Sequence, residues 1–305
     1  MIRWLDEHQP KLLSLIMLMI LATMYSLGFL SASLATLDTG PISAGGFRVI
    51  LASLFLLVVV RVTGVGLVKG AVMWRYAAIY GTVCMAVPFT ILPWTLTYLS
   101  NATAAIYFAV IPFEVLVLSW IFLGSPVSAR KWAGFAIASG GLTFLVLAGA
   151  KGAADTLAGP ELRADSDMPL WVPHLVCILT AICIAIGGVL FQKMPKASPV
   201  AITASALLIG NLIAVPAVLW SPPPAIPSPE GMFWLLVSGL VATGCAMILR
   251  GMLIRRESAI YTSTNGYVAP VISAIIGFIA LGETVGPVAI LSYLLVLGGL
   301  LLSRA

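Results

Sequence analysis

Glu114 lies in the middle of an apolar stretch, IYFAVIPFEVLVLSW, and follows Pro112 by two residues. If this stretch crosses a membrane, an ionised carboxylate near its centre costs about 2.5–3.5 kcal/mol on insertion scales. Two kinds of chemistry suit such a group: pairing with the ammonium group of a ligand, or binding and releasing a proton. A structural alternative is a protonated carboxyl that hydrogen-bonds backbone groups freed by Pro112. Acids inside membrane helices are functional by default, so we favour the first two.

Thr103 and Tyr107 lie on the same helical face as Glu114. At 100° per residue the three side chains fall on one narrow stripe. A stripe of polar and aromatic residues gains nothing by facing lipid, so it faces either a cavity or a neighbouring helix. Both alternatives stay open from the sequence.

Arg48 is a second charged residue inside an apolar segment. Its guanidinium could bind a carboxylate, pair with Asp38 or reach the membrane interface, and we favour a gating or structural role. Tyr25, Trp94 and Tyr267 are further candidates for lining a cavity. For Trp and Tyr near helix ends, an interface belt is the competing interpretation.

The composition determines the elements that must position these residues. Hydrophobic residues make up 61% of the 305-residue chain and charged residues only 9%, against about 25% charged in soluble domains. A bilayer-spanning helix needs about 20 predominantly apolar residues. Continuous rather than alternating apolar runs exclude a β-barrel. The sequence predicts ten membrane helices, at 12–34, 41–61, 73–93, 101–123, 131–150, 170–191, 199–220, 231–250, 259–281 and 287–303.

Lysine and arginine are unevenly distributed between the predicted loops, and this bias predicts orientation. Thirteen of the sixteen lie at the chain ends or in even-numbered loops, with Arg250 among them; Lys151 and Arg163 lie on the other side, and Arg48 lies within a helix. Both termini are therefore expected in the cytoplasm. The basic charge is explained by topology, so nucleic acid is not an expected partner.

Other chemistries find little support in the sequence. The four cysteines lie inside predicted spans without CxxC spacing, and the two histidines suggest no metal site. No P-loop motif occurs, and we expect no cofactor. The first apolar run is too long for the core of a signal peptide, so we expect a retained helix.

An internal repeat is visible at a constant offset of 158 residues. The offset relates Pro41 to Pro199, Gly81 to Gly239, Pro112 to Pro270, Gly124 to Gly282, Val127 to Val285, Gly140 to Gly298, Gly141 to Gly299, Thr103 to Tyr261, Tyr107 to Asn265 and Glu114 to Ile272. Pro112 and Pro270 therefore belong to the repeated architecture, whereas the acid occurs in one half only. Tyr261 and Asn265 form a second polar stripe on the ninth predicted helix and are further candidates for substrate binding. An odd number of helices per repeat makes the two halves inverted.

These features resemble the drug/metabolite transporter superfamily, and within it the EamA family of ten-helix exporters. The resemblance rests on PISAGGFRVILASLFLL, LGSPVSARKWAGFAIASGGL and LGETVGPVAILSYLLVLGGL and covers essentially the whole chain. Family members usually have an acid after LG in both repeats; Glu283 supplies it in the second, and Ser125 replaces it in the first. The resemblance also matches Arg48 with an arginine of the family's second helix.

The sequence therefore predicts an all-α integral membrane protein of two inverted five-helix repeats. We expect a first repeat at 1–150, an extracytoplasmic linker at 151–169 and a second repeat at 170–305. The central cavity is expected between the third, fourth, eighth and ninth helices, with contributions from the first and sixth. Paired glycines suit close helix packing and a homodimer face.

The expected function is secondary active export of a small amphiphilic metabolite, such as an amino acid or derivative, across the bacterial inner membrane. Alternating access is the expected mechanism, and proton coupling is one of the roles open to Glu114. A sugar-nucleotide or phosphorylated-metabolite antiporter is the alternative. An integral membrane enzyme acting on lipid is a distant one, because it needs an acid, a base and a nucleophile at one depth.

Overall fold

Every regular element that the computed structural model describes is a helix. The description covers residues 9–124, 128–150, 169, 171–282 and 285–304; Ser125, Val127, Glu283 and nearly all of the predicted linker lie outside it. In chain order the elements are α2 (Pro10–Thr39), α3 (Pro41–Thr63), α4 (Ala71–Gly81), η1 (Thr82–Ala86), α5 (Val87–Leu96), α6 (Asn101–Phe108), α7 (Ile111–Leu123), α8 (Ala129–Ala150), α9 (Trp171–Lys193), α10 (Pro199–Trp220), α11 (Pro229–Leu236), η2 (Val237–Cys245), α12 (Ala246–Arg256), α13 (Ala259–Ser263), α14 (Asn265–Leu281) and α15 (Pro287–Arg304).

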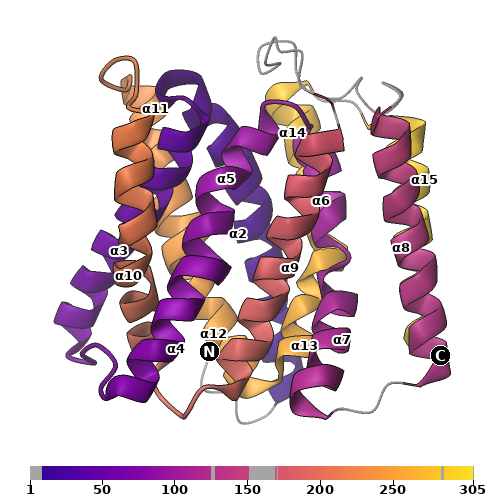
Figure 1. Cartoon of the computed structure of the whole chain (residues 1–305), viewed down its shortest axis with the longest axis horizontal. Coiled ribbons are helices and arrows are strands. Elements are labelled where there is room, and N and C mark those ends of the chain that lie inside the picture. The colour runs from indigo at the N-terminus through magenta and orange to yellow at the C-terminus, as the bar shows by residue number, and fades with distance from the viewer. Residues whose placement is uncertain (1–8, 125–127, 151–168, 170, 283–284, 305) are drawn as a thin grey trace.

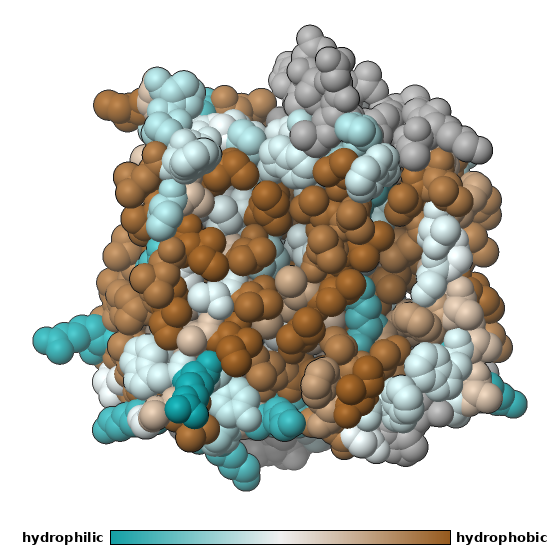
Figure 2. Space-filling view, viewed as in Figure 1, coloured by the Kyte–Doolittle hydropathy of each residue, from teal (hydrophilic) through white to brown (hydrophobic). Residues whose placement is uncertain are grey.

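The described helices form a single bundle of side-by-side rods (Figure 1). Within the part of the chain that the structure describes, nine spans are long and apolar enough to cross a bilayer, and the apolar part of α15, Pro287–Gly299, is a shorter tenth. Figure 2 shows apolar side chains over the middle of the visible face and hydrophilic ones towards its edges. Helix α2 begins and α15 ends at the same edge of the bundle, which fits an even number of crossings.

Local sequence signals set the helix ends at repeat-related positions. Pro41 and Pro199 occupy the first turns of α3 and α10, where a missing N–H does no harm. The Ser100 hydroxyl accepts a hydrogen bond from the backbone of Thr103 at the start of α6, and Ser258 caps α13 in the same way. Gly124 and Gly282 end α7 and α14 with positive φ angles of 66° and 63°.

Contacts between the halves are reciprocal, as an inverted repeat requires. Gly81 packs on the backbone of Ala206, and the repeat-related Gly239 packs on the backbone of Arg48. Each contact is the other shifted by 158 residues, with the halves exchanged. The Asn211 amide donates to the Ser53 hydroxyl at 2.9 Å, and these two residues are also 158 apart. A residue can touch its own repeat mate only near the pseudo-two-fold axis, so the axis passes between α3 and α10.

The third and eighth spans contain a feature that the sequence did not predict. Both include a π-helical segment, η1 and η2, at overlapping repeat positions. The helix departs from α geometry just before Pro88 and continues through Pro93. The fourth and ninth spans are interrupted between α6 and α7 and between α13 and α14. π-segments and broken helices are frequent at functional sites.

Helix α2 is attached to the eighth span at both of its ends. At one end the Ser14 hydroxyl bonds the Glu257 carboxylate at 2.5 Å and accepts from the Arg256 guanidinium at 2.8 Å. At the other end Asp38 accepts hydrogen bonds from the backbone and side chain of Ser228, which itself caps α11. Asp38 is thus engaged by Ser228, and Arg48 is bonded elsewhere, so the expected alternative of an Arg48–Asp38 pair is wrong.

In the repeat-related glycine pairs Gly140–Gly141 and Gly298–Gly299, only the second member makes a close contact. A Cβ added to Gly141 would lie 3.0 Å from the backbone oxygen of Ser292, whereas one added to Gly140 would meet nothing within 4 Å. Gly299 packs on Gly134, and Gly298 is as open as Gly140. Our expectation that both members of each pair serve helix packing was therefore wrong for Gly140 and Gly298.

We expect Gly141→Leu to separate α8 from α15 and to lower the melting temperature of the purified protein by several degrees, because the new side chain overlaps the backbone of α15. Gly140→Leu, one position away and open, serves as the matched control. A thermal unfolding scan in detergent measures both variants. Equal melting temperatures would contradict the packing described for α8 and α15.

Candidate functional site

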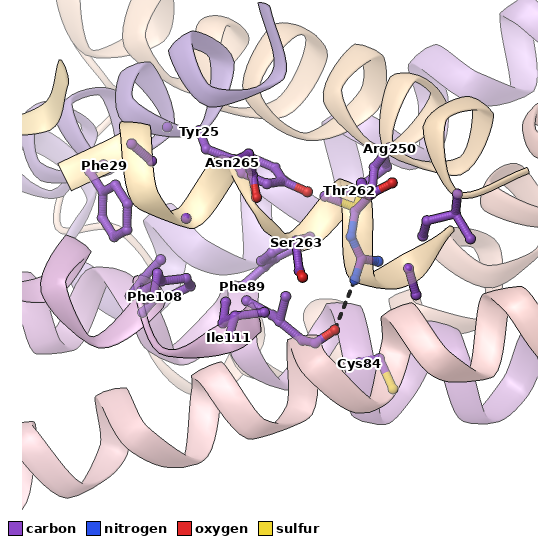
Figure 3. A pocket seen from close by; sticks show the side chains of 18 of the residues that line it. Tyr25, Phe29, Cys84, Phe89, Phe108, Ile111, Arg250, Thr262, Ser263 and Asn265 are labelled. Atoms are coloured by element: carbon purple, nitrogen blue, oxygen red, sulfur yellow. Dashed lines mark hydrogen bonds between the residues drawn. The ribbon is translucent and has the colours of Figure 1, made fainter. Parts of the chain in front are cut away.

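A central cavity lies where the interrupted helices meet (Figure 3). Its walls come from the first, third, fourth, sixth, eighth and ninth spans, as expected, and from α3 in addition. The lining residues are Tyr25, Gly28, Phe29, Arg48, Cys84, Phe89, Leu92, Phe108, Ile111, Ile184, Met247, Arg250, Ile254, Ala259, Thr262, Ser263, Asn265, Gly266 and Ala269.

One end of the cavity is aromatic. The rings of Phe29 and Phe108 meet edge to face with centroids 5.1 Å apart, and in Figure 3 both lie far from Arg250. Phe89 lies between these ends, and the Arg48 guanidinium stacks on its ring at 4.7 Å. The cavity is therefore amphiphilic, with an apolar end and a cationic end.

Arg48 is held in the cavity wall by the π-helical segment η2. Its Nε donates to the Thr243 hydroxyl at 2.6 Å, and its Nη2 contacts the carbonyl of Ala242 at 3.4 Å. The Thr243 hydroxyl in turn donates to Ser238 five residues back, a spacing that belongs to a π-turn. Arg48 is only 3% exposed, and its Nη1 has no hydrogen-bond partner among the described residues.

Arg250 is a cavity residue that sequence reasoning missed. We placed it in a cytoplasmic loop because the hydropathy window ends there, but α12 continues to Arg256 and buries Arg250 to 7% exposure. Its Nη1 donates to the Tyr80 hydroxyl at 3.0 Å and its Nη2 to the carbonyl of Ile184 at 2.9 Å. A signal was present: four apolar or small residues separate Arg250 from the pair Arg255–Arg256.

Two of the sequence-predicted candidates join the arginines in the wall. Tyr25 and Asn265 both line the cavity, beside the hydroxyl groups of Thr262 and Ser263 (Figure 3). The Tyr25 hydroxyl is buried without a hydrogen-bond partner among the described residues, and it interacts electrostatically with both Arg48 and Arg250. Polar groups from α2, α3, α12, α13 and α14 thus converge.

Glu114 is partly buried on α7 but is not a cavity-lining residue. One carboxyl oxygen, Oε2, is buried and has no hydrogen-bond partner among the described residues. This oxygen therefore does not satisfy a backbone group freed by Pro112. Cys183 on α9 lies in its neighbourhood. Pro112 lies in the first turn of α7, whereas Pro270 lies inside α14.

The rest of the predicted stripe is divided by the break between α6 and α7. The Tyr107 hydroxyl hydrogen-bonds the His174 ring at 2.5 Å, and Thr103 bonds the capping Ser100. Neither lines the cavity. Nor do Tyr261, Trp94 and Tyr267: Tyr261 packs beside α2, Trp94 contacts the Tyr98 ring, and the Tyr267 carbonyl accepts from Tyr293.

Among the described residues, no three His, Cys, Asp or Glu side chains come together in a way that could hold a metal ion. The cavity instead presents hydroxyl, amide and guanidinium donors beside apolar rings. Such a site binds and orients a ligand through complementary polar and apolar contacts.

Comparison with known proteins agrees with this architecture. A family model described as the EamA-like transporter family matches residues 12–147 and 171–305. The chain is a member of the EamA-like transporter family. The all-helical membrane fold and the two-repeat architecture of this EamA-like transporter, both predicted from the sequence, are confirmed.

A comparison of this chain with curated protein sequences found no match. Among the solved structures that are similar to this chain, one is described as a crystal structure of a protein. It superposes with a TM-score of 0.67 and 16% identity, covering 95% of this chain and 96% of that chain. At this identity the likeness shows the fold alone, and it covers both repeats of the EamA-like transporter.

Proposed function

We propose that this transporter exports a small amphiphilic metabolite, such as an amino acid or a derivative, by alternating access to the central cavity. The observation that supports the proposal is the cavity itself, which combines the aromatic rings of Phe29 and Phe108 with the guanidinium groups of Arg48 and Arg250. The cavity lies between inverted repeats, which is the usual position for a transported solute.

Orientation and location are part of the same proposal. With Arg250 inside the membrane, twelve of the sixteen basic residues remain at the ends and even-numbered loops (13 − 1 = 12), against Lys151 and Arg163 on the other side. This bias supports a cytoplasmic location for both termini and a bacterial inner membrane as the site of action. The outward-facing Gly140 and Gly298 are where a homodimer would pack.

We assign proton coupling, rather than cargo binding, to Glu114. Its position outside the cavity wall favours a proton site over a partner for a substrate ammonium. Its buried Oε2 has no hydrogen-bond partner among the described residues. An ionised carboxylate at such a position costs free energy, and binding a proton or a neighbouring cation removes that cost. A proton taken up in one conformation and released in the other would drive export.

The alternative antiporter function gains support from Arg250. Sugar nucleotides and phosphorylated metabolites require cationic cavity residues, and two arginines line the wall instead of one. The structure adds no support for a lipid-modifying enzyme, because no carboxylate or imidazole is found among the described residues that line the cavity.

Filling the cavity tests the central proposal. Ala269 on α14 is buried in the cavity wall, so Ala269→Phe is expected to lower the transport rate at least about tenfold by occupying the space of the cargo. Ala280→Phe is the control, since Ala280 is exposed on the same helix. Solute release is measured from proteoliposomes loaded with amino acid mixtures and N-acylated amino acids. A rate for Ala269→Phe equal to that of the control would contradict transport through this cavity.

A further inference from the structure

The charge of the cavity is unbalanced among the described residues. Its wall contains two guanidinium groups, Arg48 and Arg250, and no carboxylate. Four acidic residues are described elsewhere: Asp38 accepts hydrogen bonds from Ser228, Glu114 lies outside the wall on α7, Glu230 is exposed, and Glu257 lies beside Arg256. Neither cavity arginine forms a salt bridge with any of them.

A buried positive charge without an anion is costly in a protein interior, and more so within a membrane. Arg48 and Arg250 are 3% and 7% exposed. Their bonds go to neutral acceptors: the Thr243 hydroxyl and the Ala242 carbonyl for Arg48, and the Tyr80 hydroxyl and the Ile184 carbonyl for Arg250. Neutral oxygens orient a guanidinium but leave its charge uncompensated.

Hydrogen-bonding capacity also remains unused at this end of the cavity. The Nη1 of Arg48 and the hydroxyl of Tyr25 are buried and have no partner among the described residues. Tyr25 interacts electrostatically with both guanidinium groups. Each guanidinium carries more N–H groups than its two bonds use. These unused donors belong to residues that line the same cavity, and N–H and O–H donors match the oxygens of an oxyanion.

The two arginines are positioned by equivalent helices of the repeat. A Cβ on Gly28 of α2 would lie 3.3 Å from the Nη2 of Arg48, and a Cβ on Gly188 of α9 would lie 3.1 Å from the Nη2 of Arg250. Helices α2 and α9 begin the two repeats, so each first helix holds one guanidinium against a glycine. Arg48 and Arg250 are not themselves repeat mates, and the position related to Arg250 is Leu92. The pair therefore belongs to the site and not to the duplicated scaffold.

We propose that the cavity selects organic anions, whose carboxylate or phosphate group binds to Arg48 and Arg250 while the apolar part packs on Phe29, Phe89 and Phe108. This inference rests on the proposed transport function and narrows its cargo to molecules with net negative charge. A free amine is rejected, because the cavity wall offers two cations and no carboxylate to receive it. An N-acylated amino acid or an aromatic carboxylate then fits better than a zwitterionic amino acid.

The experiment uses purified full-length protein and four probes that share a phenyl group but differ in the head: phenylacetate, phenyl phosphate, phenylalanine and phenethylamine. Equilibrium binding is measured by ligand-dependent thermal stabilisation in detergent. We expect at least one of the two anions to bind about tenfold or more tightly than phenethylamine, with phenylalanine in between. The order of phenylacetate and phenyl phosphate distinguishes a carboxylate cargo from a phosphorylated one.

Variants assign the effect to the arginines. Arg48→Gln and Arg250→Gln are each expected to weaken binding of the preferred anion about tenfold or more. Arg61→Gln is the matched control, because Arg61 is an exposed arginine of the same helix as Arg48. If either arginine variant fails to fold, Asn265→Asp provides an isosteric test that leaves both arginines intact. Its added carboxylate should weaken anion binding and strengthen phenethylamine binding.

Two results overturn the anion proposal: phenethylamine binding as tightly as both anions, or no binding of either anion by the folded protein. Anion binding that is unchanged in Arg48→Gln, Arg250→Gln and Asn265→Asp would also overturn the anion proposal. Release of the preferred anion from proteoliposomes is measured separately. Binding without release would contradict the transport function and leave anion selection standing, whereas release of amines alone would contradict anion selection and leave transport standing.

Discussion

Replacement of Glu114 by Gln is expected to leave a folded transporter whose cargo gradient no longer follows the proton gradient. Glutamine has almost the shape of glutamic acid but cannot release a proton. The buried Oε2 has no hydrogen-bond partner among the described residues, so the exchange breaks no hydrogen bond at this oxygen. Downhill movement of cargo through the cavity should continue, because Glu114 is not part of its wall.

The expected size of this effect follows from coupling. If one proton exchanges for one cargo molecule and the membrane potential is held at zero, a difference of one pH unit supports about a tenfold cargo ratio across the membrane. The wild-type protein should reach this ratio in proteoliposomes, and Glu114→Gln should stay at a ratio of about one. Glu230→Gln removes an exposed carboxylate and serves as the control. Accumulation by Glu114→Gln at the wild-type level would rule out Glu114 as the coupling residue.

The largest structural effect is expected for Gly81→Val. Gly81 ends α4 directly before η1, and a Cβ there would overlap the carbonyl of Ala206 on α10. Because both partners are helix backbone, neither can move aside as a flexible side chain would. We expect the free energy of unfolding to fall by more than about 4 kcal/mol, enough to abolish monodisperse protein on size-exclusion chromatography.

Gly239→Val tests the same contact in the other repeat, where the added carbon would lie 2.6 Å from the Leu51 Cβ. It should also destabilise, but less, because a side-chain atom is the nearest obstacle. Gly140→Val introduces the same residue into an open helical site and controls for the lower helix propensity of valine. Normal folding of Gly81→Val would contradict the close approach of α4 and α10.

Much of the scaffold could be predicted from the sequence because its signals are local or periodic. Apolar runs predicted the spans, and the constant offset predicted the repeat. Pro41 and Pro199 begin helices, and Gly124 and Gly282 end them, by backbone chemistry alone. The π-segments could not be predicted. They depend on how backbone bonds rearrange within the bundle, and no residue type in TVCMA marks such a rearrangement.

The site was only partly predictable for a related physical reason. A hydropathy window treats arginine as the end of a span, but a guanidinium can point into a polar cavity while its helix continues, as Arg250 does. Periodicity likewise assumed one unbroken helix from Thr103 to Glu114, and the break between α6 and α7 separates their faces. Tyr25 and Arg48 were found because each lies within an unbroken helix, whereas Asn265, the first residue of α14, was found through its repeat relation to Tyr107.

The attachment of α2 to the eighth span at both ends has a consequence for motion. Two rods fixed to one another at both ends, through Ser14 with Glu257 and Asp38 with Ser228, must tilt together. If the cavity opens by alternating access as proposed, α2 and the eighth span are expected to move together and not to part from one another. Bending is then expected at the elements with interrupted backbone bonding, α6 with α7 and α13 with α14. Arg250 lies on the eighth span and Asn265 on α14, so such bending would change the distance between the guanidinium and amide groups that line the cavity.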